Sequence, residues 1–380
     1  MLSFKFEPAS FVRSCCRHRR GTRRVAVPSP EYRMDSTRST LTASLILLAC
    51  SLCLAACGKH EPAQPAPPSY FDNTGRTDVL SGGARMIPIK TPQGDFRVWT
   101  KRVGNNPNVK VLLLHGGPGA THEYFEAFDS FFPAAGFEYY YYDQLGSAYS
   151  DQPTDPALWD TPRFVEEVEQ VRQALGLNKE NFILLGHSWG GVLALEYALK
   201  YQQHLKGLVI SNMMASGPAY NDYAKKVLMP AMDPKALAEV QQMEATGKTT
   251  DPRYMELLMP LHYEKHILRM PAAQWPDPVN RAFAHLNLGV YVPMQGPSEL
   301  GLSGKLLEWD RIADLPKVAV PTLVIGARHD TMDPAHMEMM AGKVQNGRYL
   351  FCPNGSHMAM YDDQQTYFDG LIRFVNDVAR

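Results

Sequence analysis

The sequence has little cysteine and almost no net charge. It contains six cysteines, 28 glycines and 29 prolines in 380 residues, and 20% of its residues are charged. These are ordinary values for a globular protein, so a disulfide scaffold, a collagen-like chain and a disordered chain are excluded as descriptions of the whole. The formal net charge is -1, but the charges are unevenly distributed. Nine Lys and Arg and only three acidic residues precede position 57. The mildly acidic remainder has no electrostatic reason to bind nucleic acid.

Motifs that bind metals or nucleotides are also missing. After position 57 the chain holds a single cysteine, Cys352, and it contains neither an H-E-x-x-H pattern nor a G-x-G-x-x-G after a predicted strand. Those patterns supply the ligands and the phosphate-binding turn that such cofactors need. We therefore expect neither a metal nor a nucleotide cofactor.

One uncharged run lies near the N-terminus. The sixteen residues from Leu41 to Ala56 carry no charge and lead into Cys57-Gly58. This run is too short for a membrane-spanning helix and is typical of a signal peptide. Its end resembles the lipobox of bacterial lipoproteins, in which the cysteine is acylated and becomes the mature N-terminus. We expect an exported protein that is lipid-anchored through Cys57 and faces the periplasm or the cell exterior. A cleaved secretory signal or an uncleaved anchor is the alternative.

The chain divides into five segments. Residues 1–56 form the targeting segment, and 57–75 form a proline-rich tether, a composition that favours an extended spacer. Core sequence follows at 76–212 and 312–380. Between them, 213–311 is rich in methionine and has no strand-like run, so we predict an inserted helical cap.

Short apolar runs alternate with helical patterns in the two core segments. Strands are predicted at 109–115, 137–143, 182–186, 208–211, 322–326 and 349–352, and helices at 163–175, 192–201 and 367–378. The apolar runs are continuous rather than alternating, which is typical of parallel strands covered on both faces. The order predicts an α/β fold with a mostly parallel central sheet flanked by helices.

A G-x-S-x-G pattern occurs at 186–190, between a predicted strand and a predicted helix. A serine at this position stands on a tight turn, and small residues on both sides are needed to avoid a collision. A glycine-rich loop, His115-Gly-Gly-Pro-Gly119, follows an earlier strand and can supply one of the two N–H groups that an oxyanion requires. We predict Ser188 as the nucleophile and the N–H groups of Gly117 and Trp189 as the oxyanion hole.

A serine nucleophile needs a base and an acid that orients the base, and in folds with this motif they follow in the order acid, histidine. His357 is the one histidine after the last predicted strand, and Asp330 follows the strand 322–326. Asp333 competes for the acid role, but it lies further from the strand and precedes Pro334. We predict Ser188, Asp330 and His357 as a catalytic triad.

Four motifs together resemble the proline iminopeptidases, or prolyl aminopeptidases, of the α/β-hydrolase superfamily. They lie at 115–119, 142–147, 186–191 and 296–299, and the resemblance runs from about Arg97 to the C-terminus. It implies an α/β-hydrolase fold and the release of an N-terminal residue, often proline, from peptides. By position it also implies that Glu299 binds the free amine of the substrate, which a carboxylate can do by a charge-assisted hydrogen bond. The chain departs from one branch of the family at Thr331, where that branch has a second amine-binding glutamate.

These motifs together predict a serine aminopeptidase that acts on a small peptide or amide. An amidase or esterase that uses the same triad without amine recognition is one alternative. A surface lipoprotein that binds a ligand without turning it over is another, and the fold alone does not choose between them.

Overall fold

The computed structural model describes residues 69–380. The targeting segment predicted for 1–56, the acylation site predicted at Cys57 and the tether up to residue 68 lie outside the described residues. Residues 69–75, which we assigned to the tether, lie against the domain, where the Asn105 side chain donates to the Asp72 carbonyl at 2.7 Å. Within 69–380, every helix is too short or too polar to cross a membrane.

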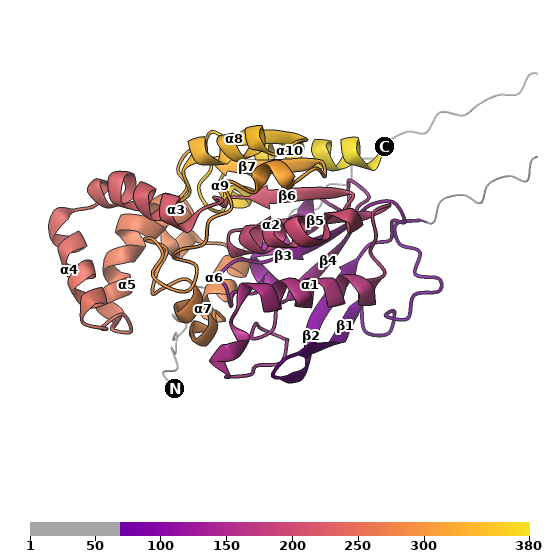
Figure 1. The fold of residues 1–380 in the computed structure, drawn as a ribbon, viewed down its shortest axis with the longest axis horizontal. Coiled ribbons are helices and arrows are strands. Elements are labelled where there is room, and N and C mark those ends of the chain that lie inside the picture. The colour runs from indigo at the N-terminus through magenta and orange to yellow at the C-terminus, as the bar shows by residue number, and fades with distance from the viewer. Residues whose placement is uncertain (1–68) are drawn as a thin grey trace, which may run out of the picture. The chain divides into compact units, whose positions relative to one another are not determined.

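An eight-stranded sheet forms the centre of the domain, in the order β1-β2-β4-β3-β5-β6-β7-β8 (Figure 1). The strands are β1 (Ala84–Thr91), β2 (Gly94–Val103), β3 (Lys110–Leu114), β4 (Glu138–Asp143), β5 (Phe182–His187), β6 (Gly207–Ser211), β7 (Thr322–Ala327) and β8 (Gly347–Cys352). β2 pairs antiparallel with β1 and β4, and all other neighbours are parallel. The predicted α/β class with a mostly parallel sheet is confirmed.

The hairpin of β1 and β2 was not predicted, and its outer strand β1 lies at the edge of the sheet. In β1, Ile87 and Ile89 are buried while the residues between and before them are exposed. Pro88 interrupts this short alternation, and a proline is tolerated there because an edge strand leaves some N–H positions unpaired. The apolar run is therefore too short to be recognised as a strand.

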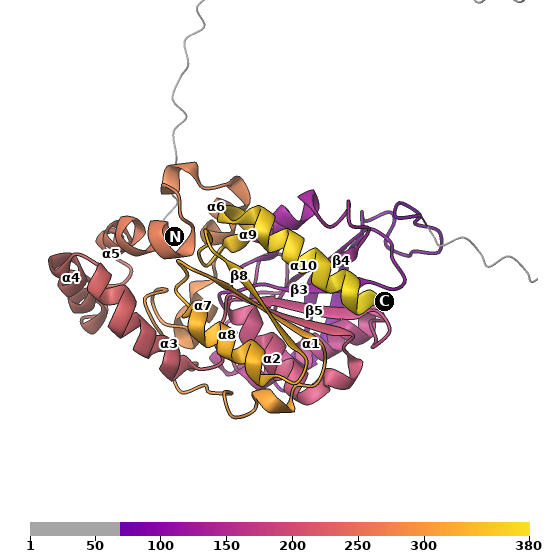
Figure 2. The same ribbon diagram turned by 90° about the horizontal axis from the view of Figure 1, so that it is seen from above.

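Helices cover both faces of the sheet (Figures 1 and 2). The α-helices are α1 (Thr161–Leu175), α2 (Trp189–Tyr201), α3 (Gly217–Tyr223), α4 (Pro234–Ala245), α5 (Pro252–Leu258), α6 (Asp277–Ala284), α7 (Leu288–Met294), α8 (Pro334–Lys343), α9 (Ala359–Asp362) and α10 (Gln364–Ala379). The 3₁₀ helix η1 (His122–Ser130) and the π-helix η6 (Met259–Ile267) also border the site described below. Shorter 3₁₀ or π turns lie at Pro156–Leu158, Gln202–His204, Ala224–Leu228, Met229–Ala231, Ala272–Gln274 and Leu315–Lys317.

Two hydrophobic cores lie on opposite faces of the sheet. Leu112 and Leu114 of β3 pack into the core with α1, α2 and α8, while Val111 and Leu113 pack into the core with η1 and α10. Successive side chains of a strand point to opposite faces. Burial of both faces therefore requires the continuous apolar runs seen in the sequence.

The chain between β6 and β7 is helical and includes the region predicted as a cap, 213–311. It contains α3 to α7 and η6, and Figure 1 shows these helices beside one end of the sheet. Ion pairs fasten α6 to the core, since Arg281 contacts Glu123 at 2.7 Å and Glu126 at 2.5 Å, both in η1. The helical region is thereby held over the carboxyl ends of the parallel strands, where ligands bind in α/β sheets.

Candidate active site

Ser188 stands on a sharp turn between β5 and α2. Its φ is 56° and its ψ is -129°, a conformation that a residue with a side chain rarely adopts. The turn is tightly packed, because a Cβ at Gly186 would lie 1.9 Å from the Gly190 carbonyl oxygen and one at Gly190 would lie 2.0 Å from the Leu114 carbonyl oxygen. Only glycine fits at either position. The G-x-S-x-G pattern is thus a direct consequence of how closely β5, α2 and β3 approach one another.

The structure brings Asp330 and His357 into direct contact. His357 Nδ1 donates to Asp330 Oδ1 at 2.8 Å, and both side chains are buried. Asn212, at the end of β6, donates to the other carboxylate oxygen at 2.7 Å. The predicted competitor Asp333 is used differently, since its carboxylate caps α8 by accepting from the Ala335 N–H at 3.0 Å. With the proton on Nδ1, His357 Nε2 carries a lone pair and can accept a proton.

A chain of hydrogen bonds joins the glycine loop to the His357 loop. The Gly116 N–H donates to Tyr124 Oη at 2.7 Å, and Tyr124 Oη donates to His187 Nδ1 at 3.1 Å. His187 Nε2 in turn donates to the His357 carbonyl at 2.8 Å. Burial, with a smaller effect of nearby His357, lowers the pKa of His187 to about 3, so it is neutral at neutral pH. His187 therefore positions its neighbours and does not carry protons.

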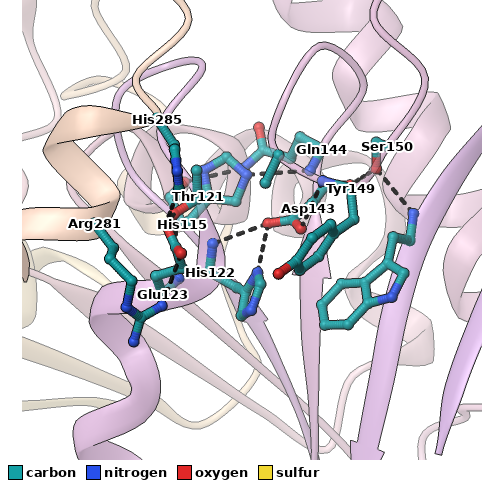
Figure 3. A network of polar contacts seen from close by, with 12 residues as sticks. His115, Thr121, His122, Glu123, Asp143, Gln144, Tyr149, Ser150, Arg281 and His285 are labelled. Carbon is teal, nitrogen blue, oxygen red and sulfur yellow. Dashed lines mark hydrogen bonds and ion pairs between the residues drawn. The ribbon is translucent and has the colours of Figure 1, made fainter. Parts of the chain in front are cut away.

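The motif residues after β4 support the glycine loop (Figure 3). His115 Nε2 accepts from the Gln144 N–H at 3.1 Å, and the Gln144 side-chain amide donates to the His115 carbonyl at 2.9 Å. The Gln144 amide oxygen accepts from the Trp189 indole at 2.8 Å. Asp143 accepts from both the backbone N–H and Nδ1 of His122, at 2.9 and 2.8 Å. This network ties the loop, β4 and the start of α2 into one rigid unit.

A cavity of about 260 Å³ contains Ser188, Gly117, His357 and Glu299 in its wall. The rest of its lining is mainly apolar and aromatic and includes Tyr254, Met255, Tyr263, Phe283 and Leu288 from the helical region. Trp189, the other predicted oxyanion donor, is the first residue of α2 and follows Ser188 directly. A helix leaves its first N–H groups without partners inside the helix, which suits them to bind an oxyanion.

Glu299 supplies the single carboxylate among the described residues that line this cavity. Burial raises its pKa above the usual value, although nearby His357 and the Tyr291 hydroxyl oppose the rise. Tyr291 Oη donates to Glu299 Oε1 at 2.5 Å. A half-buried carboxylate with one neutral donor is poorly compensated, and a cation in the cavity would stabilise its ionised form.

The pKa of His357 is set by burial and by the neighbouring carboxylates. Burial lowers its pKa, but the Asp330 carboxylate, by charge and by hydrogen bond, and Glu299 outweigh that effect. The pKa of His357 therefore lies above the usual value for a histidine. A base of this kind is neutral only above that pKa.

Several contacting residues are invisible to motif analysis. Tyr124 contacts Gly116 beside the predicted donor, Asn212 contacts Asp330 and Tyr291 contacts Glu299, yet none of the three belongs to a pattern with fixed spacing. Asn212 had a usable signal, because it directly follows β6 at the carboxyl edge of the sheet, where site residues collect. The tyrosines had none, since apolar runs contain many aromatic residues that serve only in packing.

Most of the described chain is similar to known proteins. Residues 110–364 match the family described as alpha/beta hydrolase fold. A proline iminopeptidase of Flavobacterium johnsoniae is 58% identical over 293 residues, covering 77% of this chain and 98% of the relative. One of Elizabethkingia meningoseptica is 60% identical over 295 residues, with the same coverage.

Two solved structures also align with most of this chain. The crystal structure of VinJ aligns with a TM-score of 0.71 at 28% identity and covers 77% of this chain and 99% of its own. The proline iminopeptidase of Mycobacterium smegmatis aligns with a TM-score of 0.68 at 27% identity, covering 78% of this chain and 98% of its own.

The glycines of the Ser188 turn can be tested by their effect on stability. We expect Gly186→Ala to lower the free energy of unfolding by about 3 kcal/mol or more, because the added methyl collides with a backbone carbonyl that cannot move. Gly342→Ala is the matched control, since the added methyl meets no atom within 4 Å in α8, and it should stabilise by about 0.5 kcal/mol. Urea unfolding measures both. Equal stability of the two variants would contradict the packing argument.

The charge of Glu299 should set the pH dependence of the His357 base. Since Glu299 raises the pKa of His357, Glu299→Gln should move the acidic limb of the kcat/KM profile to lower pH. The profile is measured on an activated acetate ester, which has no amine for Glu299 to bind. Glu180→Gln, at a surface position with 77% of its side chain exposed, should leave the limb in place. A limb that stays put in Glu299→Gln, or moves upward, would refute the coupling.

Proposed function

The chain belongs to the proline iminopeptidase family of the α/β-hydrolases, and we propose from this membership how its residues perform the reaction. It is a prolyl aminopeptidase, a serine hydrolase that releases an N-terminal proline from peptides. One observation carries the assignment of residues: a half-buried carboxylate, Glu299, shares a single cavity with Ser188 and His357. An amine site and a nucleophile in one cavity are what an aminopeptidase needs.

In the proposed mechanism Ser188 Oγ attacks the carbonyl carbon of the first peptide bond while His357 Nε2 takes its proton. The bond from His357 Nδ1 to Asp330 holds the imidazole in the tautomer that can do this and stabilises the imidazolium that forms. The N–H groups of Gly117 and Trp189 stabilise the oxyanion. His357 then protonates the departing amine, and water hydrolyses the acyl-enzyme in a second cycle of the same proton transfers.

Glu299 is the proposed partner of the substrate ammonium. Its pKa is raised by burial, so a bound cation would balance its charge and favour its ionised form. The residue after Asp330 is Thr331, whose hydroxyl donates to Asp330 Oδ1 at 3.3 Å. Thr331 therefore supports the acid, and the amine site depends on one carboxylate. An amidase or esterase indifferent to the amine would gain nothing from a half-buried, weakly compensated carboxylate in its cavity.

Export and lipid anchoring through Cys57 are proposed on the sequence of residues 41–58 alone. A lipid on Cys57 would tether the domain to a membrane by the proline-rich segment before Tyr70. The substrates would then be peptides outside the cytoplasm.

Amine recognition is tested with a prolyl anilide and its N-acetylated twin. Loss of a desolvated contact between ammonium and carboxylate costs about 2 kcal/mol, so kcat/KM should favour the free amine by roughly thirtyfold. Glu299→Gln should remove most of this preference, and Ser188→Ala should abolish turnover of both substrates. Equal cleavage of the two anilides by the wild type would instead support the amidase or esterase alternative.

Lipid anchoring is tested by changing the acylated residue. In cells that process lipoproteins, we expect the wild-type chain in the membrane fraction with incorporated labelled fatty acid. Cys57→Ser should lose the label and leave the membrane fraction. Cys352→Ser is the control and should keep both, since Cys352 lies at the end of β8 inside the core. Label on Cys57→Ser would exclude Cys57 as the anchor.

A further inference from the structure

One short helix contacts both the amine end and the triad end of the cavity. At its first turn, η6 meets Glu299, whose N–H donates to Tyr263 Oη at 3.2 Å. The Glu299 carbonyl accepts from His262 Nε2 at 3.0 Å, and from Tyr220 Oη of α3 at 2.6 Å. The backbone of Glu299 is thus held by side chains on both its polar groups.

The last turn of η6 meets the two loops that carry the acid and the base. His266 Nδ1 donates to the carbonyl of His329, the residue before Asp330, at 2.9 Å. The His266 carbonyl accepts from the His357 N–H at 2.9 Å. The next carbonyl, that of Ile267, accepts from the Met358 N–H and from Ser356 Oγ, both at 2.9 Å.

Glu299 lies outside the helices and strands. It lies between α7 and β7, in a stretch where the described chain forms neither an α-helix nor a strand of the sheet. A residue in such a stretch takes its place from the side chains that bond to it. Tyr220 and Tyr291 also bond to Glu299, but η6 is the element that joins its backbone to the loops of Asp330 and His357.

The two histidines of η6 act as fixed donors. A carbonyl oxygen can only accept, so the proton must be on Nε2 of His262 and on Nδ1 of His266. Burial, helped by His266, lowers the pKa of His262 to about 3, and burial also lowers that of His266. Both rings are therefore neutral at neutral pH and keep these tautomers.

We propose that His262 and His266 are positioning residues that hold Glu299 at a set distance from Ser188 and His357, so that the site spans one residue. The proposal rests on the proposed function, in which the amine of the first residue binds Glu299 while its carbonyl carbon meets Ser188. Both contacts must form at once, and a displacement of about 1 Å can reduce the rate by up to about a hundredfold. η6 connects the two ends through bonds that reach all three loops.

His262 donates from Nε2 and His266 from Nδ1, so the same pair of amide substitutions should have opposite effects at the two positions. The amide of glutamine reaches about as far as Nε2 of histidine, and the amide of asparagine about as far as Nδ1. His262→Gln and His266→Asn should therefore keep the donor, whereas His262→Asn and His266→Gln should lose it. The readout is the ratio of kcat/KM for the prolyl anilide to that for its N-acetylated twin. We expect the ratio to fall roughly tenfold in the two variants that lose the donor and to stay within about twofold of wild type in the other two.

The ratio separates positioning from folding. Both substrates are turned over by the same folded molecules, so a variant that is partly unfolded loses both activities in proportion and keeps its ratio. The positioning role would be wrong if the same amide gave the higher ratio at both positions. It would also be wrong if all four ratios stayed at the wild-type value. Double variants add a second criterion. In a Glu299→Gln background, His262→Asn should change the ratio no further, because His262 acts through Glu299.

Failure of this proposal can be told apart from failure of the proposed function. If Glu299→Gln alone leaves the wild-type ratio intact, amine recognition by Glu299 is wrong and the proposed function falls with it. If Glu299→Gln removes the preference while His262→Asn and His266→Gln retain it, only the positioning role of η6 is overturned.

Discussion

The close approach of β5, α2 and β3 at Ser188 is the constraint on which the site depends. Gly186 and Gly190 meet backbone carbonyls at distances that no side chain could tolerate, and Ser188 is thereby forced to a positive φ. A strained serine persists only when its surroundings hold it there, and here the two cores on either face of β5 do so. Packing alone thus fixes the position of Ser188, the proposed nucleophile.

A second constraint comes from burying charge beside that turn. Asp330 is buried and Glu299 is half-buried in the cavity wall, and both raise the pKa of His357. Asp330 is well compensated, since both of its oxygens accept hydrogen bonds, whereas Glu299 has one hydroxyl partner on its carboxylate. The proposed catalytic acid, Asp330, is therefore well satisfied by hydrogen bonds, whereas the proposed amine-binding acid, Glu299, is not. The difference between them lies in their neighbours and not in their chemistry.

The fold was largely readable from the sequence because buried parallel strands require continuous apolar runs. The hairpin of β1 and β2 was not, because Ile87 and Ile89 alternate with exposed residues at an edge. In the site, Ser188, Asp330 and His357 follow from a motif and from their places after strands. Tyr291 and His262 do not, because hydrogen bonds between distant segments leave no spacing in the sequence to detect.

The position of β8 and of the loop after it determines when the site is completed during synthesis. His357 lies close to the C-terminus, and its loop is completed by contacts with Asp362 at the end of α9. A ribosome therefore finishes the nucleophile long before the base, and a nascent chain already holding the Ser188 turn has no means to activate it. A chain cut before β8 would keep the Ser188 turn but lack the proposed base, so by the proposed mechanism it could not cleave peptides.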